Sequence, residues 1–315
     1  MKSFEEQLTG VKSVAIAGHV RPDGDCVGSC LATYNYIRNY YPKIEVALYL
    51  EPIPNKFKFL AGAADILHSC KEEKIYDLFI SQDCGDIDRL GEAADYFRAA
   101  KRTICVDHHI SNTGYADENY IFPYASSTSE LIFGLIGETK ITREIAECLY
   151  VGIINDTGVF QYSCTSAKTM EIGGKLMEMG IDFPQIVDHT FYTRTYEQNQ
   201  ILGKALLVAR LYADGRIIAS VITAKDMAMY HVLPRHLDGI VSQLRVTKGV
   251  EAAVLLYETE DGAYKASLRS NGQVDAAKLA VAFGGGGHER AAGFSMEGNP
   301  DAIVSTIVAE IEKQL

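Results

Sequence analysis

The sequence has little positive charge, no long apolar run and no C-x-x-C pair of cysteines. Its 315 residues carry 30 Lys and Arg against 41 Asp and Glu, which gives a net charge of −11 at pH 7. Binding to long duplex nucleic acid depends on many contacts of Lys and Arg with phosphates, so we expect no such partner. A short anionic ligand fits if metal ions and a few arginines supply local positive charge.

No apolar stretch approaches the ~20 residues that span a bilayer, and the first residues, MKSFEEQ, lack the apolar segment of a secretory signal. The seven cysteines are an odd number without a C-x-x-C pair, which fits a reducing compartment better than a disulfide framework. We therefore expect a cytoplasmic protein with no membrane partner. The length predicts two domains, with one large domain as the alternative, and 47% hydrophobic residues are enough for a sizeable core.

The first third of the chain alternates short apolar runs with helical patterns, which predicts βαβ units and a parallel sheet. The expected strands are residues 12–17, 44–50, 76–82 and 103–106. The expected helices are residues 26–40, 55–60, 88–99, 131–137, 142–154 and 165–180. Ser127 and Glu130 have capping-box spacing, and we favour a helix cap there over a phosphate site at the same helix start.

Acidic and imidazole side chains follow three of the expected strands. They are His19, Asp23 and Asp25 after the first strand, Asp83 after the third, and Asp107, His108 and His109 after the fourth. The carboxyl ends of parallel strands form one edge of a sheet, where open α/β sheets bind ligands. Asp156, on a polar turn after an apolar helix, is a further candidate. For the first group alone, a turn residue, a helix N-cap and a surface histidine are an equally good explanation.

Several carboxylates cannot crowd one pocket without partners, because like charges at close range raise each other's pKa. Divalent cations remove that penalty, and imidazole and carboxylate ligands without thiolates suit Mn²⁺ better than structural zinc. Two such ions can activate water and hold phosphoryl oxygens, which predicts phosphoester hydrolysis. His109 would then face the phosphate or act as an acid towards the leaving group. Asp107 would orient a histidine.

The second half of the chain differs from the first. Asp214-Gly215 and Asp261-Gly262 are hairpin signals. They are flanked by expected strands at residues 206–212, 216–223, 250–258 and 264–269, and helices are expected at residues 225–230, 237–244, 275–283 and 302–313. This pattern predicts a smaller α+β domain on a largely antiparallel sheet. The expected division is a catalytic domain of residues 1–186, a linker of residues 187–196 and a second domain of residues 197–315.

Four successive glycines at residues 284–287 precede His288 and Arg290 in the second half. Such a run allows close backbone approach and exposes N–H groups to an anion, whereas a flexible turn is the plain alternative. We interpret the run as a binding loop.

Together these motifs resemble the DHH phosphoesterase superfamily. The similarity lies in D-H-H at 107–109, H-x-x-P-D-x-D-x-x-G-S at 19–29, Asp83, and N-D-T-G at 155–158. G-G-G-G-H-x-x-A-A-G at 284–293 is similar to the DHH-associated C-terminal domain. The length is most similar to the NrnA-like group of oligoribonucleases (nanoRNases) and pAp phosphatases. The resemblance implies an α/β fold with a parallel-sheet DHH domain, a smaller α+β domain, and an active site in the cleft between them.

The resemblance also implies a role for each matching residue. One metal ion would be held by His19, Asp23 and Asp83, and the other by Asp25, Asp83, His108 and Asp156. The catalytic residues would be His109, Asp83 and Asp107. The implied substrate-binding residues are Arg245, Arg269, Ser270, Gly285, Gly286, Gly287 and His288. Arg245 and Arg269 also fit a plain surface role.

The implied activity is Mn²⁺-dependent hydrolysis of short single-stranded RNA or DNA oligonucleotides to mononucleotides, and of pAp to AMP. Mg²⁺ and Co²⁺ are alternative ions. Two other functions stay open: a phosphodiesterase for cyclic or linear dinucleotides such as cyclic di-AMP or pGpG, and a non-catalytic nucleotide-binding module. The complete set of expected ligands argues against the module. A homodimer is compatible with the sequence.

Overall fold

The fold is taken from a computed structural model that describes residues 2–71 and 73–315. The chain divides between Thr193 and Arg194 into two compact units. Helical turns at Phe183–Val187 and Asp188–Tyr192 come directly before the division. Among the described residues, none of the helices is both long and apolar enough to cross a lipid bilayer.

The first unit is built on a five-stranded sheet in which all neighbouring strands are parallel. The strands are β1 (Ser13–Ala17), β2 (Glu45–Tyr49), β3 (Leu78–Gln82), β4 (Thr103–Asp107) and β5 (Glu118–Ile121). Their order is β2-β1-β3-β4-β5. The chain therefore leaves β1 towards one edge and returns to its other side at β3, and such a switch point is where open sheets bind ligands.

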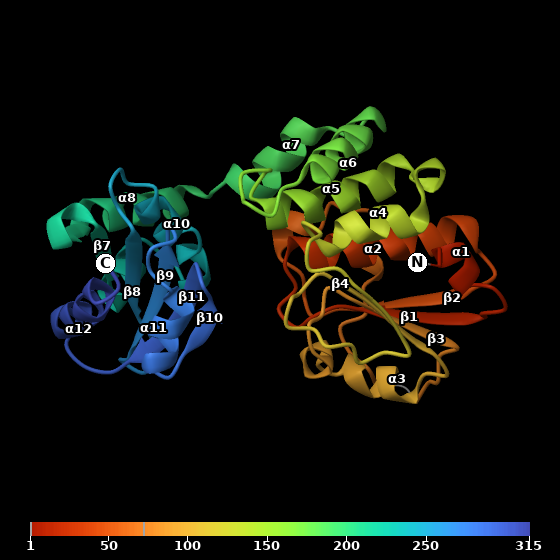
Figure 1. The fold of residues 1–315 in the computed structure, drawn as a ribbon, viewed down its shortest axis with the longest axis horizontal. Coiled ribbons are helices and arrows are strands. Elements are labelled where there is room, and N and C mark those ends of the chain that lie inside the picture. Colours follow the sequence, from red (N-terminus) through yellow and green to blue (C-terminus); the bar gives the residue numbers. More distant parts are fainter. Residues whose placement is uncertain (1, 72) are drawn as a thin grey trace. The chain divides into compact units, whose positions relative to one another are not determined.

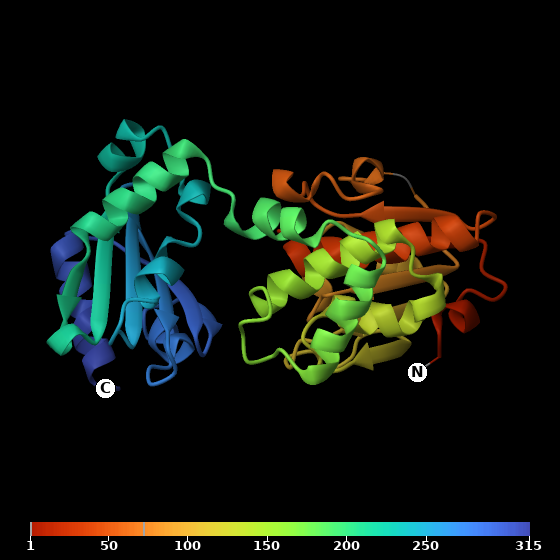
Figure 2. The same cartoon turned by 90° about the horizontal axis from the view of Figure 1, so that it is seen from above.

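Helices cover both faces of this sheet, which is why every residue of the central strands β3 and β4 is buried and most are apolar. The helices are α1 (Phe4–Gln7), α2 (Gly24–Tyr40), α3 (Ala93–Ala99), α4 (Thr128–Ile136), α5 (Arg143–Thr157), α6 (Ala167–Glu178) and α7 (Phe183–Val187). Helices α2, α4 and α5 share the core on one face, and α3 covers the other (Figure 1). Seen from above, α4 and α5 lie across the strands (Figure 2). The predicted parallel-sheet domain is confirmed.

The second unit contains a six-stranded mixed sheet in the order β10-β11-β9-β8-β7-β6. Its strands are β6 (Arg210–Tyr212), β7 (Ile217–Ile222), β8 (Ala252–Glu258), β9 (Tyr264–Ser270), β10 (Gly286–His288) and β11 (Ala291–Met296). Both predicted hairpins form, as the antiparallel pairs β6–β7 and β8–β9, and β7–β8 is a parallel pair. The largely antiparallel α+β architecture is thus confirmed.

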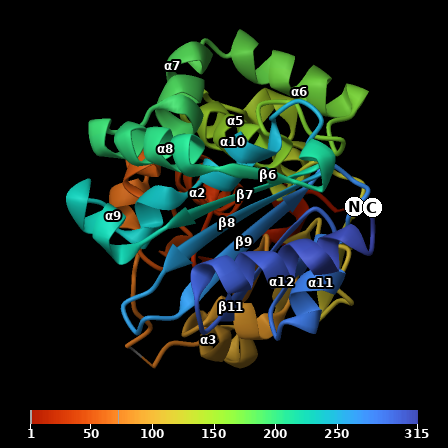
Figure 3. The same ribbon diagram turned by 90° about the vertical axis from the view of Figure 1, so that its left-hand side faces the viewer.

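Helices flank this second sheet on both sides (Figure 3). They are α8 (Tyr196–Val208), α9 (Ala224–Met229), α10 (Ile240–Arg245), α11 (Ala276–Ala282) and α12 (Pro300–Glu312). Helices α11 and α12 share a core with β8, β9 and β11. On the other face, α8, α9 and α10 share a core with β7 and β8 only.

Several predicted elements differ from the structure. The strand expected at 206–212 is wrong in its first half, because a Thr195–Gln198 capping box starts α8 and the helix continues to Val208. Residues 55–60 form only a short 3₁₀ turn. The helix expected at 88–99 is divided by Gly91, whose φ of 58° interrupts it. Strand β5 was not predicted, because its sequence ENYI has a single buried residue.

The close packing of α2 against α5 depends on glycine. A Cβ atom added to Gly28 would lie 2.4 Å from the backbone oxygen of Cys148, and one on Gly152 would lie 1.9 Å from Ser129 Oγ. Real atoms do not approach this closely, so the helices would have to separate. Asp25 lies in the first turn of α2 and Asp156 in the last turn of α5, so this approach also brings the two carboxylates together.

We predict that Gly28→Ala lowers the free energy of unfolding by about 1–3 kcal/mol, the usual effect of overpacking a rigid core. Gly174→Ala is the matched control, because Gly174 is also helical but a Cβ there meets no atom within 4 Å. That control should be neutral or stabilising by about 0.5–1 kcal/mol, since alanine favours helix. Urea unfolding followed by circular dichroism measures both. Equal behaviour of the two variants would contradict the packing argument.

Candidate metal centre

The centre of the site is Asp83, the residue that follows β3. Its backbone has a φ of 52°, a left-handed conformation that aspartate tolerates better than most residues. Its N–H donates to the carbonyl of Val106 at 3.0 Å, which fixes it to the end of β4. The carboxylate is 2% exposed. Asp83 therefore places a buried carboxylate at the carboxyl end of the central strand, in the middle of this sheet edge.

Two histidines flank this carboxylate on opposite oxygens. His19 Nε2 lies 3.6 Å from Asp83 Oδ2, and His108 Nε2 lies 3.5 Å from Asp83 Oδ1. The Nδ1–H of His19 donates to the Val20 carbonyl at 2.9 Å, so Nε2 is the nitrogen that faces the carboxylates. Such spacing between ligand atoms, one on each side, allows Asp83 to bridge two ions.

The first group is completed by Asp23, whose Oδ1 lies 3.7 Å from His19 Nε2. Asp23 is also the N-cap of α2 and accepts hydrogen bonds from the N–H groups of Asp25 and Cys26, each at 3.1 Å. The alternative explanation of this group, with Asp25 as the cap and His19 on the surface, is wrong: Asp23 is the cap and His19 is buried. The Asp23 carboxylate caps the helix and still faces the histidine. Its side chain is 53% exposed, so one ligand of this group faces solvent.

The second group joins residues from three separate segments. His108 Nε2 lies 3.0 Å from Asp156 Oδ2 and 4.0 Å from Asp25 Oδ2. Asp25 is completely buried and accepts hydrogen bonds from the N–H groups of Thr128 at 2.6 Å and Ser129 at 2.9 Å. These are the first N–H groups of α4, so the positive end of that helix supports the Asp25 charge.

The N-terminus of α4 therefore binds a negatively charged group, but this group is the protein's own Asp25 carboxylate and not a phosphate. Ser127 caps the helix by accepting the Glu130 N–H at 3.1 Å, as predicted. The Glu130 carboxylate does not complete a capping box with Ser127, because it accepts the hydroxyl groups of Ser126 and Thr169, each at 2.8 Å.

The pKa values of the acids reflect the crowding of negative charge. Burial, followed by repulsion from Asp83 and Asp156, raises the pKa of Asp25. Burial also raises the pKa of Asp156 to about 6. Burial acts in the same direction on Asp83, but its contacts with His108 and His19 outweigh it and hold that pKa well below its usual range.

The histidines show the complementary effect. Burial lowers the pKa of His19 and of His108, yet their contacts with the carboxylates outweigh burial and raise both values to about 12. Without other cations, the imidazoles themselves must carry the balancing charge. Divalent ions can replace those protons, and the donor set of carboxylate oxygens and imidazole nitrogens suits them. The six predicted metal ligands thus lie together and fit one or two ions.

Asp107 and His109 form a hydrogen-bonded pair at the end of β4, and His109 Nδ1 also lies 3.7 Å from Asp83 Oδ1. The Asp107 Oδ1 atom accepts from His109 Nδ1 at 2.7 Å, and Asp107 Oδ2 accepts from Asn112 Nδ2 at 2.6 Å. The hydrogen bond to Asp107 raises the pKa of His109. Asp107 is fully buried, and its contacts fit an orienting role. His109 Nε2 is left available for another group.

Sequence reasoning missed the residues that support these side chains. Thr128 Oγ1 donates to Asp83 Oδ1 at 3.1 Å, and Asn155 Oδ1 accepts the Gly24 N–H at 3.0 Å. The orienting Asn112 and the buried Cys26 beside His19 were also missed. Asn155 was visible only as part of the N-D-T-G motif, and the others had no distinguishing spacing. Asp86 and Asp88, two acids shortly after Asp83, are a helix cap and an exposed residue.

In the second unit, the strand register places two predicted binding residues in one row. Ala291 is directly opposite Arg269 on one side and His288 on the other. Opposed residues of antiparallel strands point to the same face, so Arg269 and His288 share a face with one small side chain between them. Gly286 and Gly293 form the neighbouring row.

Ser270 and Arg245 have other partners in this unit. Ser270 is 2% exposed, on the opposite face of β9 from Arg269, and its hydroxyl accepts the Gly272 N–H at 3.0 Å. Arg245 donates from Nη1 to Asn271 Oδ1 at 2.5 Å. Their contacts with substrate stay predictions.

The glycine run differs from the expected loop. Gly286, Gly287 and His288 form the short edge strand β10. A Cβ on Gly285 would lie 2.2 Å from the Gly293 oxygen, and one on Gly287 would lie 2.5 Å from the Ala291 oxygen. The approach of β10 to β11 therefore requires glycine at these two positions, whether or not a ligand binds there.

Comparison with known proteins points in one direction. Residues 13–153 match the DHH family, N-terminal domain, and residues 215–314 match the DHHA1 domain. The chain is 26% identical to the bifunctional oligoribonuclease and PAP phosphatase NrnA of Thermus thermophilus, covering 100% of this chain and 94% of that protein. It is also 26% identical to the protein of the same name from Bacillus subtilis, covering 95% and 94%. The crystal structure of an exopolyphosphatase-related protein from Bacteroides fragilis is similar with a TM-score of 0.90 at 27% identity, covering 98% of this chain and 94% of that one.

We predict that Asp83→Asn weakens divalent-metal binding at least about tenfold, because one carboxylate faces both histidines. Asp88→Asn is the control, because the Asp88 side chain is 85% exposed and its ion-pair partner is Arg98, at 3.5 Å, rather than a histidine. Calorimetric titration of chelator-treated protein with Mn²⁺ measures both. Unchanged affinity and stoichiometry in Asp83→Asn, with circular dichroism showing a native fold, would exclude Asp83 as a ligand.

Proposed function

Because the chain belongs to the DHH family, with a DHH N-terminal domain followed by a DHHA1 domain, we propose that it is a divalent-metal-dependent phosphoesterase. Its substrates are short oligoribonucleotides, hydrolysed to mononucleotides, and pAp, hydrolysed to AMP. The observation that carries this proposal is the convergence of four aspartates and two histidines around Asp83. The names of full-length relatives, which are oligoribonucleases and PAP phosphatases, support the choice of substrate.

Two groups of ligands are proposed to hold the ions. His19, Asp23 and Asp83 hold one, and Asp25, Asp83, His108 and Asp156 hold the other. When bound, the ions supply Lewis-acid activation of the attacking water and positive charge for the phosphoryl oxygens. Mn²⁺ is the proposed ion, because nitrogen and oxygen ligands in this ratio suit it.

The protein's own residues orient the reaction. Asp107 holds His109 through Nδ1, so His109 Nε2 can donate a hydrogen bond to a phosphate oxygen or a proton to the leaving oxygen. The hydrogen bond to Asp107 raises the pKa of His109 and so favours the protonated form that such a donor needs. The α4 N–H groups hold the Asp25 carboxylate in place, and the Thr128 hydroxyl holds that of Asp83.

The second unit is proposed to bind the phosphates of the substrate. Arg269 and His288 lie in one row of a sheet face, and the small residues Ala291, Gly293 and Gly286 leave that face free of bulky side chains. Arginine is well suited to phosphate because its guanidinium can donate two parallel hydrogen bonds. Gly285, Gly287, Ser270 and Arg245 are proposed to shape this binding face.

A cytoplasmic location is part of the proposal. All seven cysteines are free thiols, and six of them lie at least partly inside the protein. Such usage is typical of a reducing compartment.

The function is tested by following hydrolysis of 5′- and 3′-labelled substrates with added Mn²⁺. The panel contains RNA and DNA of two to five nucleotides, pAp, pGpG, cyclic di-AMP and a long duplex. We expect turnover of short RNA and pAp, loss of turnover with chelator, and none on the duplex. Turnover restricted to cyclic di-AMP or pGpG would replace the proposed function with a dinucleotide phosphodiesterase, and no metal-dependent turnover on any substrate would reject it.

Arg269 allows a separate prediction about substrate binding. Arg269→Ala should raise KM for a dinucleotide by roughly 10- to 100-fold, the effect of about 1.5–3 kcal/mol for a charged hydrogen bond. KM for a small chromogenic phosphodiester, which has no second nucleotide to hold, should change little. Lys265→Ala is the control, because Lys265 is exposed on the same face of β9. Equal losses on both substrates, or an equal effect of Lys265→Ala, would contradict the binding role.

A further inference from the structure

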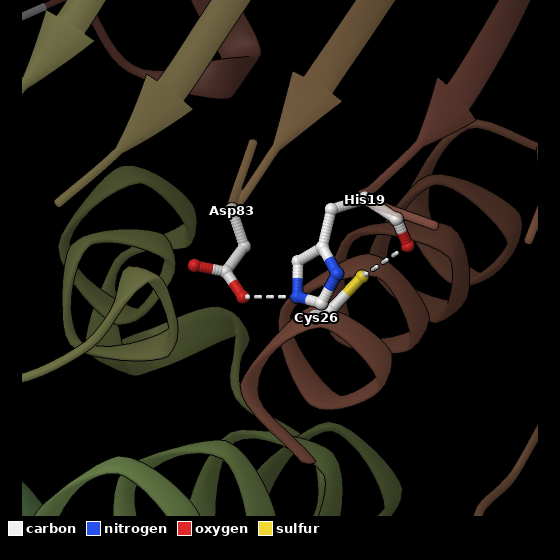
Figure 4. A group of neighbouring side chains, drawn as sticks. All are labelled: His19, Cys26 and Asp83. Carbon is white, nitrogen blue, oxygen red and sulfur yellow. Dashed lines mark hydrogen bonds and ion pairs between the residues drawn. The ribbon is translucent and has the colours of Figure 1, made fainter. Parts of the chain in front are cut away.

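A buried cysteine lies beside the first group of metal ligands. Cys26 is the second residue after Gly24 in α2, and it has no exposed surface. Its Sγ atom, one ligand atom of His19 and one of Asp83 all lie within 4.8 Å of one another. Figure 4 shows the sulfur next to the His19 imidazole, which lies between it and Asp83 in this view. The thiol is therefore part of the ligand cluster in space.

The local structure makes room for this sulfur. A Cβ atom on Gly18 would lie 2.3 Å from Cys26 Sγ, so the glycine that ends β1 leaves the space that the thiol fills. The thiol donates to the His19 carbonyl, and the sulfur–oxygen distance of 3.8 Å is long even for a weak sulfur hydrogen bond. The thiol thus has a defined position, and its hydrogen bonds, with the His19 carbonyl and with the Cys30 side chain, are both weak.

With Cys26, the first group becomes a four-ligand set of one nitrogen, two oxygens and one sulfur. The nitrogen-to-oxygen distances are 3.6 Å to Asp83 and 3.7 Å to Asp23. Ligands at ~2.0–2.3 Å from a tetrahedral ion are roughly 3.3–3.8 Å apart, so these atoms already have the spacing of one coordination shell. The sulfur is the one member that has to move inward.

The second group has no such sulfur among its clustered ligand atoms. In the described part of the chain, the cluster there consists of Asp25, His108 and Asp156. Thiolate ligands favour Zn²⁺ and other thiophilic ions, whereas carboxylate-rich groups favour Mn²⁺ or Mg²⁺. The two groups share Asp83, but the first contains a soft sulfur donor and the second contains only harder oxygen and nitrogen donors. They should therefore prefer different ions.

We propose that Cys26 is a thiolate ligand of the ion held by His19, Asp23 and Asp83, and that this position selects a thiophilic ion such as Zn²⁺ or Co²⁺ over Mn²⁺. The inference rests on the metal site of the proposed function and changes the choice of ion at one of its two positions. Binding breaks the S–H bond, forms a sulfur–metal bond and releases the proton to solvent, so no oxidant or reductant is needed.

The direct test is the spectrum of the full chain, freed of metal by chelation and titrated with Co²⁺. A sulfur ligand produces an intense near-ultraviolet band from thiolate-to-cobalt charge transfer, which imidazole and carboxylate ligands do not produce. We expect this band in the wild type and its loss in Cys26→Ser and Cys26→Ala. Cys30→Ser and Cys164→Ser should keep it; Cys30 is buried one turn along α2, and Cys164 is exposed.

Competition between ions gives the second readout. Cys26→Ser should weaken Zn²⁺ binding by roughly 10- to 100-fold. Loss of a residue that only supports a ligand already has an effect of this size, so loss of a ligand should have at least the same effect. The same change should leave Mn²⁺ affinity nearly unaltered. Absence of the band in the wild type, its persistence in both Cys26 variants, or an equal loss of Zn²⁺ and Mn²⁺ affinity would overturn the proposal.

These measurements separate this inference from the proposed function, because none of them uses hydrolysis. If the substrate panel shows no turnover while the band depends on Cys26, the function fails and the thiolate ligand stands. If short RNA is hydrolysed while no band appears, the function stands and the thiolate ligand is rejected. Circular dichroism of each metal-free variant confirms that the fold is native, and the wild-type spectrum alone can reject the proposal.

Discussion

The crowding of four carboxylates at one edge of a parallel sheet is the constraint on which the rest of this structure depends. Asp83 contacts both His19 and His108, whereas Asp23 contacts only the first and Asp25 and Asp156 only the second. Like charges so close together raise each other's pKa, and burial adds to the cost. The protein reduces this cost in two ways on its own: histidines that carry charge, and the positive end of α4 directed at Asp25.

This arrangement explains packing features that otherwise have no local reason. Asp25 can reach the N–H groups of α4 only if α2, α4 and α5 approach closely. Gly28 and Gly152 provide that approach, and a Cβ on Gly152 would also lie 2.6 Å from Asp25 Oδ1. The left-handed backbone of Asp83 turns its carboxylate between the two histidines. Strain and close contacts are thus concentrated where the ligands converge, as is common at functional sites.

Much of the site could be predicted because strand ends are easy to locate. The apolar runs before His19, Asp83 and Asp107 identify parallel strands, and parallel strands end at one edge. The supporting contacts could not be predicted in the same way. Thr128 donates a hydrogen bond to Asp83, which is 45 residues away in the sequence. Asn112 donates one to the Cys84 carbonyl, which is 28 residues away. The fold alone brings these residues to the site. Cys26 has the sequence context of an ordinary core residue on an apolar helix.

The second unit shows the opposite limit of sequence reasoning. Its hairpins were predictable from two Asp-Gly turns, and a glycine-rich motif suggested candidate binding residues. The motif did not reveal that Gly285 and Gly287 are required by the pairing of β10 with β11. Nor did it reveal that Ser270 turns away from Arg269. Successive side chains of a strand point to opposite faces, which separates Ser270 from Arg269. This argument requires that both residues belong to the strand, and the sequence alone did not locate the end of β9.

The balance of charge links the two parts of the proposed activity. The chain as a whole is negative, and the ligand edge is its most concentrated group of buried acids. A phosphate brought to that edge without cations would meet carboxylates at short range, where repulsion in a low-dielectric site is strong. Ion binding must therefore come before productive phosphate binding at the edge, whereas Arg269 and His288 can bind phosphate independently of the ions. Metal affinity and substrate affinity are thus expected to be coupled at the first unit and separable at the second.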